Sequence, residues 1–233
     1  MLLLKKIITL CISIFLLLPV TSAFANDSSS FSSLNQSEIN DLETAKQATE
    51  GLKTQMDKQE PLFIGDPKTA ENQASTISTD MSRQAAGSYT SRAGEFLVTT
   101  DTASSSSSTW AGGHAGLVYS SNYVLESFGN KGDMNGVKLW PNDWDARYEH
   151  FQLRTVIGTT LQQDIDLALK AYNHLNKPYN YNFFNINQSS SFYCSQLVYY
   201  MFNSMYNINL NDGGAVWPVD LTQSEHAYVV YSQ

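Results

Sequence analysis

The chain has 233 residues and a formal net charge of −8, from 22 acidic and 14 basic side chains. A surface of this sign repels phosphate backbones, so the charge argues against nucleic acid as a partner. The length allows one sizeable domain and a smaller appendage.

The first 25 residues have the three parts of a secretory signal peptide. Lys5 and Lys6 form a basic start, residues 7–20 are almost wholly apolar, and residues 23–25 have alanine at both ends. The apolar run is short for a bilayer crossing, and no later run of sequence is long and apolar enough to span one. We therefore expect residues 1–25 to be removed and the protein to be secreted or extracytoplasmic, with cell-wall association as one form of this. An uncleaved N-terminal anchor is the alternative.

Residues 26–92 are predicted to be a polar helical extension or stalk. Apolar side chains recur at three- and four-residue steps over residues 37–58, with Ser37 as the expected cap. Residues 69–88 are rich in small and polar side chains and could form a second helix. This region has no catalytic constellation, so we interpret it as a spacer. A lid or pro-segment that covers a site in the following domain is the alternative.

Residues 93–233 are predicted to form one α+β domain, because strand-like segments come first, two helices follow and a last strand ends the chain. The expected strands are residues 95–100, 114–120, 123–127, 137–140, 149–156 and 227–231. The expected helices are residues 161–175, with Leu161, Ile165, Leu169 and Tyr172 on one face, and residues 192–205, with Leu197, Val198, Met201, Phe202 and Met205 as its packing face.

A single thiol remains once the signal peptide is removed, because Cys11 lies within it and Cys194 is the second cysteine. An unpaired cysteine in an exported protein is either a small buried apolar residue or a reactive nucleophile. Cys194 falls at the start of a predicted helix. Free amides and the helix dipole at that position lower a thiol pKa and can hold an oxyanion.

Two upstream residues are suitable partners for this thiol. His114 begins a predicted strand after two glycines, and Glu126 lies on the next strand, so a hairpin would bring them side by side. Thiol, imidazole and carboxylate together form the triad of a cysteine hydrolase. His226, which begins the last strand, is a competing base. Each residue also has a purely structural interpretation: a core cysteine, a hydrogen-bonded histidine and an exposed hairpin glutamate.

The four histidines do not have the pattern of a metal site. His114, His150, His174 and His226 lack the spacing of metal ligands, and one thiol adds little. We therefore predict no metal site and no cofactor.

Six short motifs occur in an order that resembles the YiiX-like branch of the NlpC-type cysteine hydrolases. They begin at Gly94, Gly113, Val124, Lys177, Tyr193 and Pro218. The resemblance covers roughly residues 93–231. It implies a circularly permuted papain-like fold, an antiparallel sheet packed on helices, in which the histidine precedes the cysteine.

The resemblance also implies roles for particular residues. Cys194 would be the nucleophile, His114 the base and Glu126 the group that orients it, while Tyr179 and Tyr193 would lie beside the substrate. This chain departs from the pattern at two positions. Gln196 stands where relatives often have glutamate, and Asn180 where they often have aspartate.

The triad implies acyl transfer through a thioester, and the resemblance implies amide substrates, often cell-wall peptides that carry D-amino acids. We therefore predict a secreted cysteine amidase or peptidase whose partner is a peptide, most specifically a cell-wall (murein) peptide. Two alternatives stay open. One is a catalytically silent module that binds a peptide or an amino acid, and the other is an acyltransferase or hydrolase of lipids like the permuted lecithin retinol acyltransferase group.

Overall fold

The computed structural model describes residues 33–68, 89–101 and 112–233, and residues 34–233 belong to one compact unit. The predicted signal peptide and the predicted helix over residues 69–88 lie outside the described residues. Within the described part of the chain, no helix has the length and apolar character needed to cross a membrane. The proposed boundary at residue 93 stays a prediction.

The helix predicted over residues 37–58 is present as α1 (Gln36–Met56), but its cap is Asn35 rather than Ser37. The Asn35 side chain accepts hydrogen bonds from the backbone amides of Ser37 and Glu38, and the Glu38 carboxylate accepts one from the Asn35 amide. This reciprocal arrangement satisfies three helix-end donors. Only part of the expected apolar stripe is covered, since the buried residues of α1 are Ala45, Thr49 and Met56.

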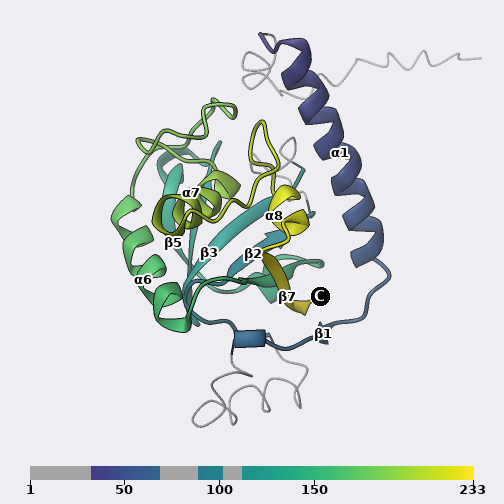
Figure 1. The fold of residues 1–233 in the computed structure, drawn as a ribbon, viewed down its shortest axis with the longest axis vertical. Helices are drawn as coiled ribbons and strands as arrows, with labels where there is room; N and C mark the ends of the chain where they lie inside the picture. The colour runs from purple at the N-terminus through teal and green to yellow at the C-terminus, as the bar shows by residue number, and fades with distance from the viewer. Residues whose placement is uncertain (1–32, 69–88, 102–111) are drawn as a thin grey trace, which may run out of the picture. The chain divides into compact units, whose positions relative to one another are not determined.

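One antiparallel sheet runs through the described residues, in the order β1-β7-β6-β2-β3-β4-β5 (Figure 1). Each predicted strand is present with small shifts of its ends, and the very short β1, which pairs with β7, was not predicted. The strands are β1 (Leu62–Phe63), β2 (Phe96–Thr99), β3 (His114–Ser120), β4 (Tyr123–Phe128), β5 (Gly136–Pro141), β6 (Gln152–Val156) and β7 (Ala227–Ser232).

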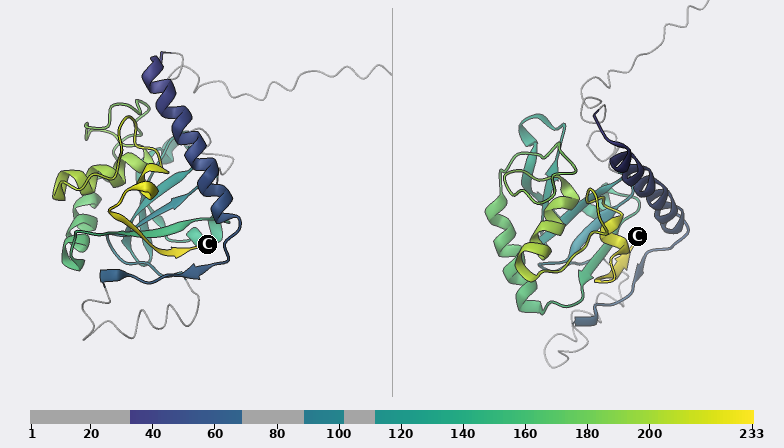
Figure 2. Two further views of the ribbon diagram at one scale, coloured as in Figure 1. Left: turned by 45° about the vertical axis from the view of Figure 1, so that its right-hand side comes forward. Right: turned by 45° about the horizontal axis from the view of Figure 1, so that its top comes forward.

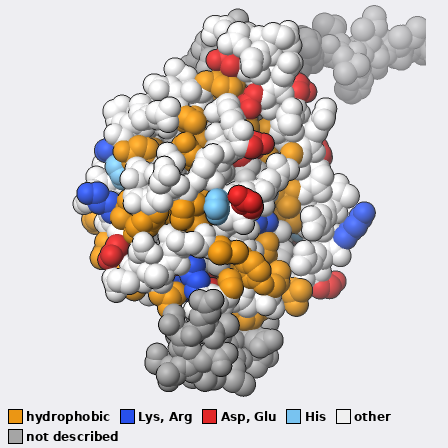
Figure 3. Space-filling model, viewed as in Figure 1, with side chains coloured by type: hydrophobic (Ala, Val, Ile, Leu, Met, Phe, Trp, Pro, Cys, Tyr) orange, Lys and Arg blue, Asp and Glu red, His pale blue; other side chains and the backbone are white. Residues whose placement is uncertain are grey.

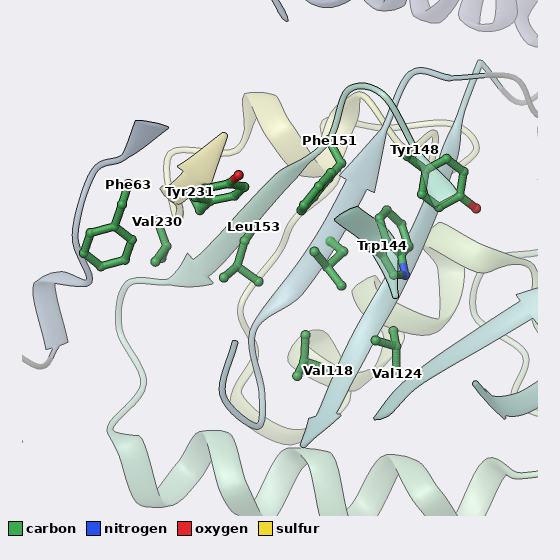
Figure 4. Packing of buried hydrophobic residues seen from close by; sticks show 10 residues of the cluster. Phe63, Val118, Val124, Trp144, Tyr148, Phe151, Leu153, Val230 and Tyr231 are labelled. Atoms are coloured by element: carbon green, nitrogen blue, oxygen red, sulfur yellow. The ribbon is translucent and has the colours of Figure 1, made fainter. Parts of the chain in front are cut away.

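Successive side chains of the central strands point to opposite faces of the sheet, and both faces are buried. Phe96 on β2 meets Phe202 of helix α7 (Cys194–Tyr206), with ring centroids 6.4 Å apart. The opposite face holds an apolar cluster that includes Leu97 and Val118 (Figure 4). That cluster is completed by Phe63, Val124, Trp144, Tyr148, Phe151, Leu153, Val230 and Tyr231. Trp144 and Tyr148 come from the short helix α5 (Trp144–Arg147) and the residue after it, which the sequence pattern did not predict.

Helix α6 (Leu161–Ala171) is shorter than predicted and is followed by the 3-10 turn η2 (Tyr172–His174). The face chosen from the sequence is the wrong one for packing. Ile165, Leu169 and Tyr172 are exposed, and the buried residues of α6 are Asp164, Leu167, Ala168 and Ala171. The inward face holds the three apolar residues Leu167, Ala168 and Ala171, and its one acid, Asp164, is buried in an ion pair with Lys68 at 2.7 Å. The remaining short elements are the 3-10 turn η1 (Gly132–Met134) and α8 (Asp220–Gln223).

Ion pairs connect the chain before residue 93 to this domain. Arg92 Nη1 lies 2.5 Å and Lys68 Nζ lies 2.7 Å from Asp164 Oδ2 on α6. Arg92 Nε also lies 2.7 Å from Asp66 Oδ2, within the segment before residue 93. On the face shown in Figure 3, the charged side chains are few and lie among apolar and uncharged polar atoms. The segment between α1 and β2 is therefore joined to the domain by charged contacts as well as by the β1–β7 pairing.

Candidate active site

Cys194 is the first residue of α7, which starts two residues later than predicted. The preceding residue, Tyr193, is extended (φ −93°, ψ 173°), and its amide donates to the Gln196 side chain at 3.2 Å, which begins the helix cleanly. The first amides of a helix have no partner within it and carry partial positive charge. Cys194 is 2% exposed and is a free thiol.

His114 is the first residue of β3 and lies close to Cys194 at the start of α7. A side chain on the preceding Gly113 would collide with the carbonyl oxygen of Thr99, and the φ of Gly113 is +131°, so this entry to the strand requires glycine. The imidazole is 1% exposed. It stacks between Phe128, with centroids 4.2 Å apart, and Trp144, with centroids 5.8 Å apart. These contacts fix the plane of the ring.

Glu126 approaches this ring from β4. The β3–β4 hairpin pairs Glu126 with Gly116, two residues after His114, and the Glu126 Oε2 atom lies 2.8 Å from His114 Nε2. The other ring nitrogen, Nδ1, is buried and has no hydrogen-bond partner among the described residues. Nδ1 is therefore the nitrogen left for the Cys194 thiol.

The electrostatics favour an ion pair between thiol and imidazole. Burial opposes a charge on His114, but hydrogen bonds to Cys194 and Glu126 and their negative charges outweigh it and raise the pKa of His114 to about 9. Burial also opposes a charged thiol, yet the contact with His114, helped by the Ala115 amide and the Ser195 hydroxyl, lowers the pKa of Cys194. The site thus favours thiolate and imidazolium over two neutral groups.

The Glu126 carboxylate is held by two residues that the sequence did not single out. Arg147 Nη2 donates to Oε1 at 2.5 Å and Arg147 Nη1 to Oε2 at 3.3 Å, while Trp144 Nε1 donates to Oε1 at 3.3 Å. Burial opposes the charge of Glu126, but His114 first and then Arg147 lower its pKa. No sequence signal identified Arg147, because the helix that carries it has only four residues and shows no periodicity.

The two predicted substrate residues lie in the interior of the domain. The Tyr193 hydroxyl donates to the Phe183 carbonyl at 2.9 Å and accepts from the Val216 amide at 2.9 Å, and Tyr193 is 1% exposed. Tyr179 is 6% exposed and packs against Tyr181, with ring centroids 4.8 Å apart. Their roles toward a substrate stay predictions.

The two departures from the family pattern contact one another. The Asn180 side chain donates to Gln196 Oε1 at 2.9 Å. The Gln196 Nε2 group points to the backbone carbonyls of Asn185, Ile186 and Gln188, at 3.2 to 3.3 Å. A neutral amide pair therefore supports the loop that leads to Cys194.

The competing base, His226, lies far across the sheet. It precedes β7, and β6 and β2 separate β7 from the strand of His114. Its side chain is 41% exposed, and its Nε2 atom lies 3.9 Å from Glu225. The structure thus brings Cys194, His114 and Glu126 together and leaves His226 apart. Among the described residues, no group of three or more His, Cys, Asp or Glu side chains is arranged to hold a metal ion.

Comparison with known proteins gives a family and one solved structure. Residues 73–232 match the family model described as "permuted papain-like amidase enzyme, YaeF/YiiX, C92 family". A structure titled "metalloprotein yiiX from Escherichia coli O157:H7" is 19% identical in sequence, with a TM-score of 0.49, and covers 62% of this chain and 99% of its own. The search of curated proteins gave no match.

The family match extends over more than half of the chain and agrees with the α+β fold described above. It confirms the expected resemblance to the permuted, YiiX-like branch. The chain belongs to the permuted papain-like amidase family C92, and it is a cysteine-type amidase or peptidase.

Proposed function

We propose that this protein is an exported amidase that hydrolyses amide bonds in cell-wall peptides through a thioester on Cys194. His114 would act as acid and base, and Glu126 would orient it. The observation that carries the proposal is the buried contact of the Glu126 carboxylate with His114 Nε2, at 2.8 Å, in a chain of an amidase family whose one described thiol interacts with the same imidazole.

The chemistry follows from which atoms are free to react. The Cys194 Sγ thiolate attacks the carbonyl carbon of the amide, and amides at the start of α7 stabilise the resulting oxyanion. The His114 imidazolium gives its Nδ1 proton to the departing amine nitrogen as the C–N bond breaks. Neutral His114 then takes a proton from water, whose oxygen attacks the thioester. The acid leaves, and the thiolate–imidazolium pair is restored.

Glu126 contributes by staying charged and fixed. A carboxylate beside Nε2 keeps that nitrogen protonated. The catalytic proton is therefore accepted and donated at Nδ1, the nitrogen left for the sulfur. His114, and then Arg147, which binds both carboxylate oxygens, lower the pKa of Glu126 and favour its ionised form despite its burial. We infer that Glu126 remains ionised throughout the cycle.

The choice of cell-wall peptides as the proposed substrate depends on the sequence. A signal-like N-terminus of 25 residues would deliver the protein to the compartment where wall peptides are met, and permuted relatives of this kind imply amide substrates. The net charge of −8 also disfavours nucleic acid as a ligand.

The test is to incubate the exported chain with purified murein peptides and to follow cleavage by mass spectrometry, with Cys194→Ser as a control of nearly equal volume. Amide cleavage by the wild type and none by the variant would support the proposal. Acyl release from phosphatidylcholine vesicles without murein cleavage would favour the lipid alternative. A parallel iodoacetamide titration of Cys194 tests for a silent module, whose thiol would be as unreactive near pH 6 as that of a free peptide.

A further inference from the structure

The helix α1 lies outside the part of the chain that matches the family, since α1 ends at Met56 and the match begins at residue 73. From the sequence it was interpreted as a spacer, or alternatively as a cover of the site. In Figures 1 and 2, α1 runs beside α8 and the loop that precedes it. The contacts of Asp41 on α1 point to a different role.

Cys194 is held in place through its two neighbours in the chain. The residues on both sides of Cys194 bind the backbone of one residue, Val216. The Val216 amide donates to the Tyr193 hydroxyl at 2.9 Å, and the Ser195 hydroxyl donates to the Val216 carbonyl at 2.6 Å. The position of Val216 therefore sets the position of the turn that carries the sulfur.

Val216 is in turn held in place by Asp41 on α1. Asp41 Oδ2 accepts hydrogen bonds from the residues on either side of it, from the Ala215 amide at 3.2 Å and from Trp217 Nε1 at 2.8 Å. A carboxylate acceptor makes these bonds stronger than neutral ones. The approach is so close that a side chain on Gly214 would overlap Asp41, and the φ of Gly214 is +70°, which also favours glycine.

The same helix also contacts the chain next to the base. A side chain on Gly112, two residues before His114, would come within 2.8 Å of Thr49 Oγ1 on α1. Thr49 is buried, and so is Ala45, which lies one turn away between Thr49 and Asp41. One rigid helix thus contacts the loop beside the thiol and the loop beside the imidazole.

We propose that Asp41 is a positioning residue for Cys194, and that α1 is a part of the catalytic unit rather than a spacer or a cover. The proposal rests on the proposed role of Cys194 as the nucleophile. Asp41 does not touch the reacting atoms. It acts through Ala215, Val216 and Trp217, which fix the turn at the start of α7 so that the sulfur faces the imidazole.

The experiment measures the rate of Cys194 alkylation by iodoacetamide between pH 4 and pH 10 in the full chain. It compares the wild type with Asp41→Ala, Asp41→Asn and His114→Ala. The matched control is Glu50→Gln, an exposed acid on the same helix. Far-UV circular dichroism and urea unfolding accompany each variant.

We expect the alkylation midpoint of Asp41→Ala to move to higher pH by about one unit, which lowers the rate near pH 6 by about tenfold and leaves the rate near pH 10 unchanged. Asp41→Asn, which keeps one acceptor oxygen, should fall between it and the wild type. Glu50→Gln should match the wild type. A role in stability alone would lower the urea midpoint, speed alkylation at high pH by exposing the thiol, and leave the midpoint of the pH profile where it was.

Trp217→Phe provides a second perturbation if Asp41→Ala fails to fold. It keeps the aromatic ring near Phe183, with centroids 6.2 Å apart, but removes the Nε1 donor to Asp41. It should shift the midpoint in the same direction by a smaller amount.

An unchanged midpoint in Asp41→Ala and Trp217→Phe, together with a shifted one in His114→Ala, would overturn this inference and leave the triad intact. Faster alkylation near pH 6 in Asp41→Ala would also overturn it, because α1 would then be a cover. An unshifted midpoint in His114→Ala would instead refute the proposed triad itself.

Discussion

Replacing Glu126 by glutamine tests the electrostatic account of the site most directly. The carboxylate accepts from His114, from Trp144 and twice from Arg147. An amide of the same shape has one acceptor oxygen and one donor group. Whichever way the amide is turned, some of these four donors then face another donor.

The magnitude follows from the pKa of His114, which is raised to about 9 from an ordinary 6.5. One pKa unit corresponds to about 1.4 kcal/mol, so the net preference for imidazolium is about 3 kcal/mol, and Cys194 and Glu126 together contribute more than this because they also offset burial. Loss of the Glu126 share should lower kcat/KM by between about tenfold and about a thousandfold, within the range of general acid–base contributions. The loss should be smaller than that of Cys194→Ala, because members of a triad act as a unit.

The pH profile should also change, with a sign that follows from the shift. A raised histidine pKa contributes stability that is fully present below pH 6.5 and is lost as the pH rises through about 9. In Glu126→Gln the imidazolium is lost at lower pH, and the thiol, without its partner, ionises at higher pH. The alkylation profile of Cys194 should therefore move to higher pH. The pH range over which thiolate and imidazolium coexist should become narrower at both ends.

The assay is kcat/KM together with iodoacetamide alkylation from pH 4 to pH 10, and the control is the double variant Glu126→Gln/Arg147→Met. The single variant should also lose about 1–3 kcal/mol of stability, because Arg147 keeps only its contact with Asp143, 2.7 Å away, as an acidic partner. The double variant should regain that stability in urea unfolding without regaining the rate. If the single variant keeps both the wild-type rate and the wild-type alkylation profile, Glu126 has no part in orienting the histidine and the reasoning fails.

Two further results are expected. His114→Ala should abolish turnover and slow Cys194 alkylation at neutral pH, whereas His226→Ala should leave both within about twofold; the reverse pattern in the same two assays would assign the base to His226. Asp220, whose pKa burial and then Asp212 and Asp41 raise to about 8, should contribute stability that is full below about pH 4 and lost as the pH rises through about 8. Between pH 5 and pH 8, the urea midpoint of Asp220→Asn should thus fall less than that of the wild type. Glu225 and His226 line the same depression but are present in both proteins, so equal falls would contradict the prediction.

Much of the candidate site was predictable because its signals are local. The strand over residues 114–120 was predicted with the bounds it has, and a hairpin of that length necessarily returns Glu126 to the neighbourhood of His114. The start of the helix at Cys194 was predicted to within two residues. The family followed from short motifs in a fixed order, and the match over residues 73–232 confirms it.

Other features depend on contacts between distant parts of the chain. Asp41 lies 176 residues from Trp217, and Glu126 lies 21 residues from Arg147, so no periodicity relates the partners. The inward face of α6 was predicted wrongly for the same reason, since Leu167, Ala168 and Ala171 pack inward and the buried Asp164 beside them finds its partner in the distant Lys68.

The six longer strands, the three longer helices, the fold class and the three candidate catalytic residues could be predicted from the sequence, because alternation, helix starts and turns are encoded within a few residues. The groups that hold those residues in place could not be predicted, because they come from distant parts of the chain. Arg147 fixes the carboxylate, the amide pair of Asn180 and Gln196 supports the loop before the thiol, and Asp41 joins α1 to the nucleophile's turn. Each of these contacts forms between side chains that approach one another only when the sheet and its helices have packed.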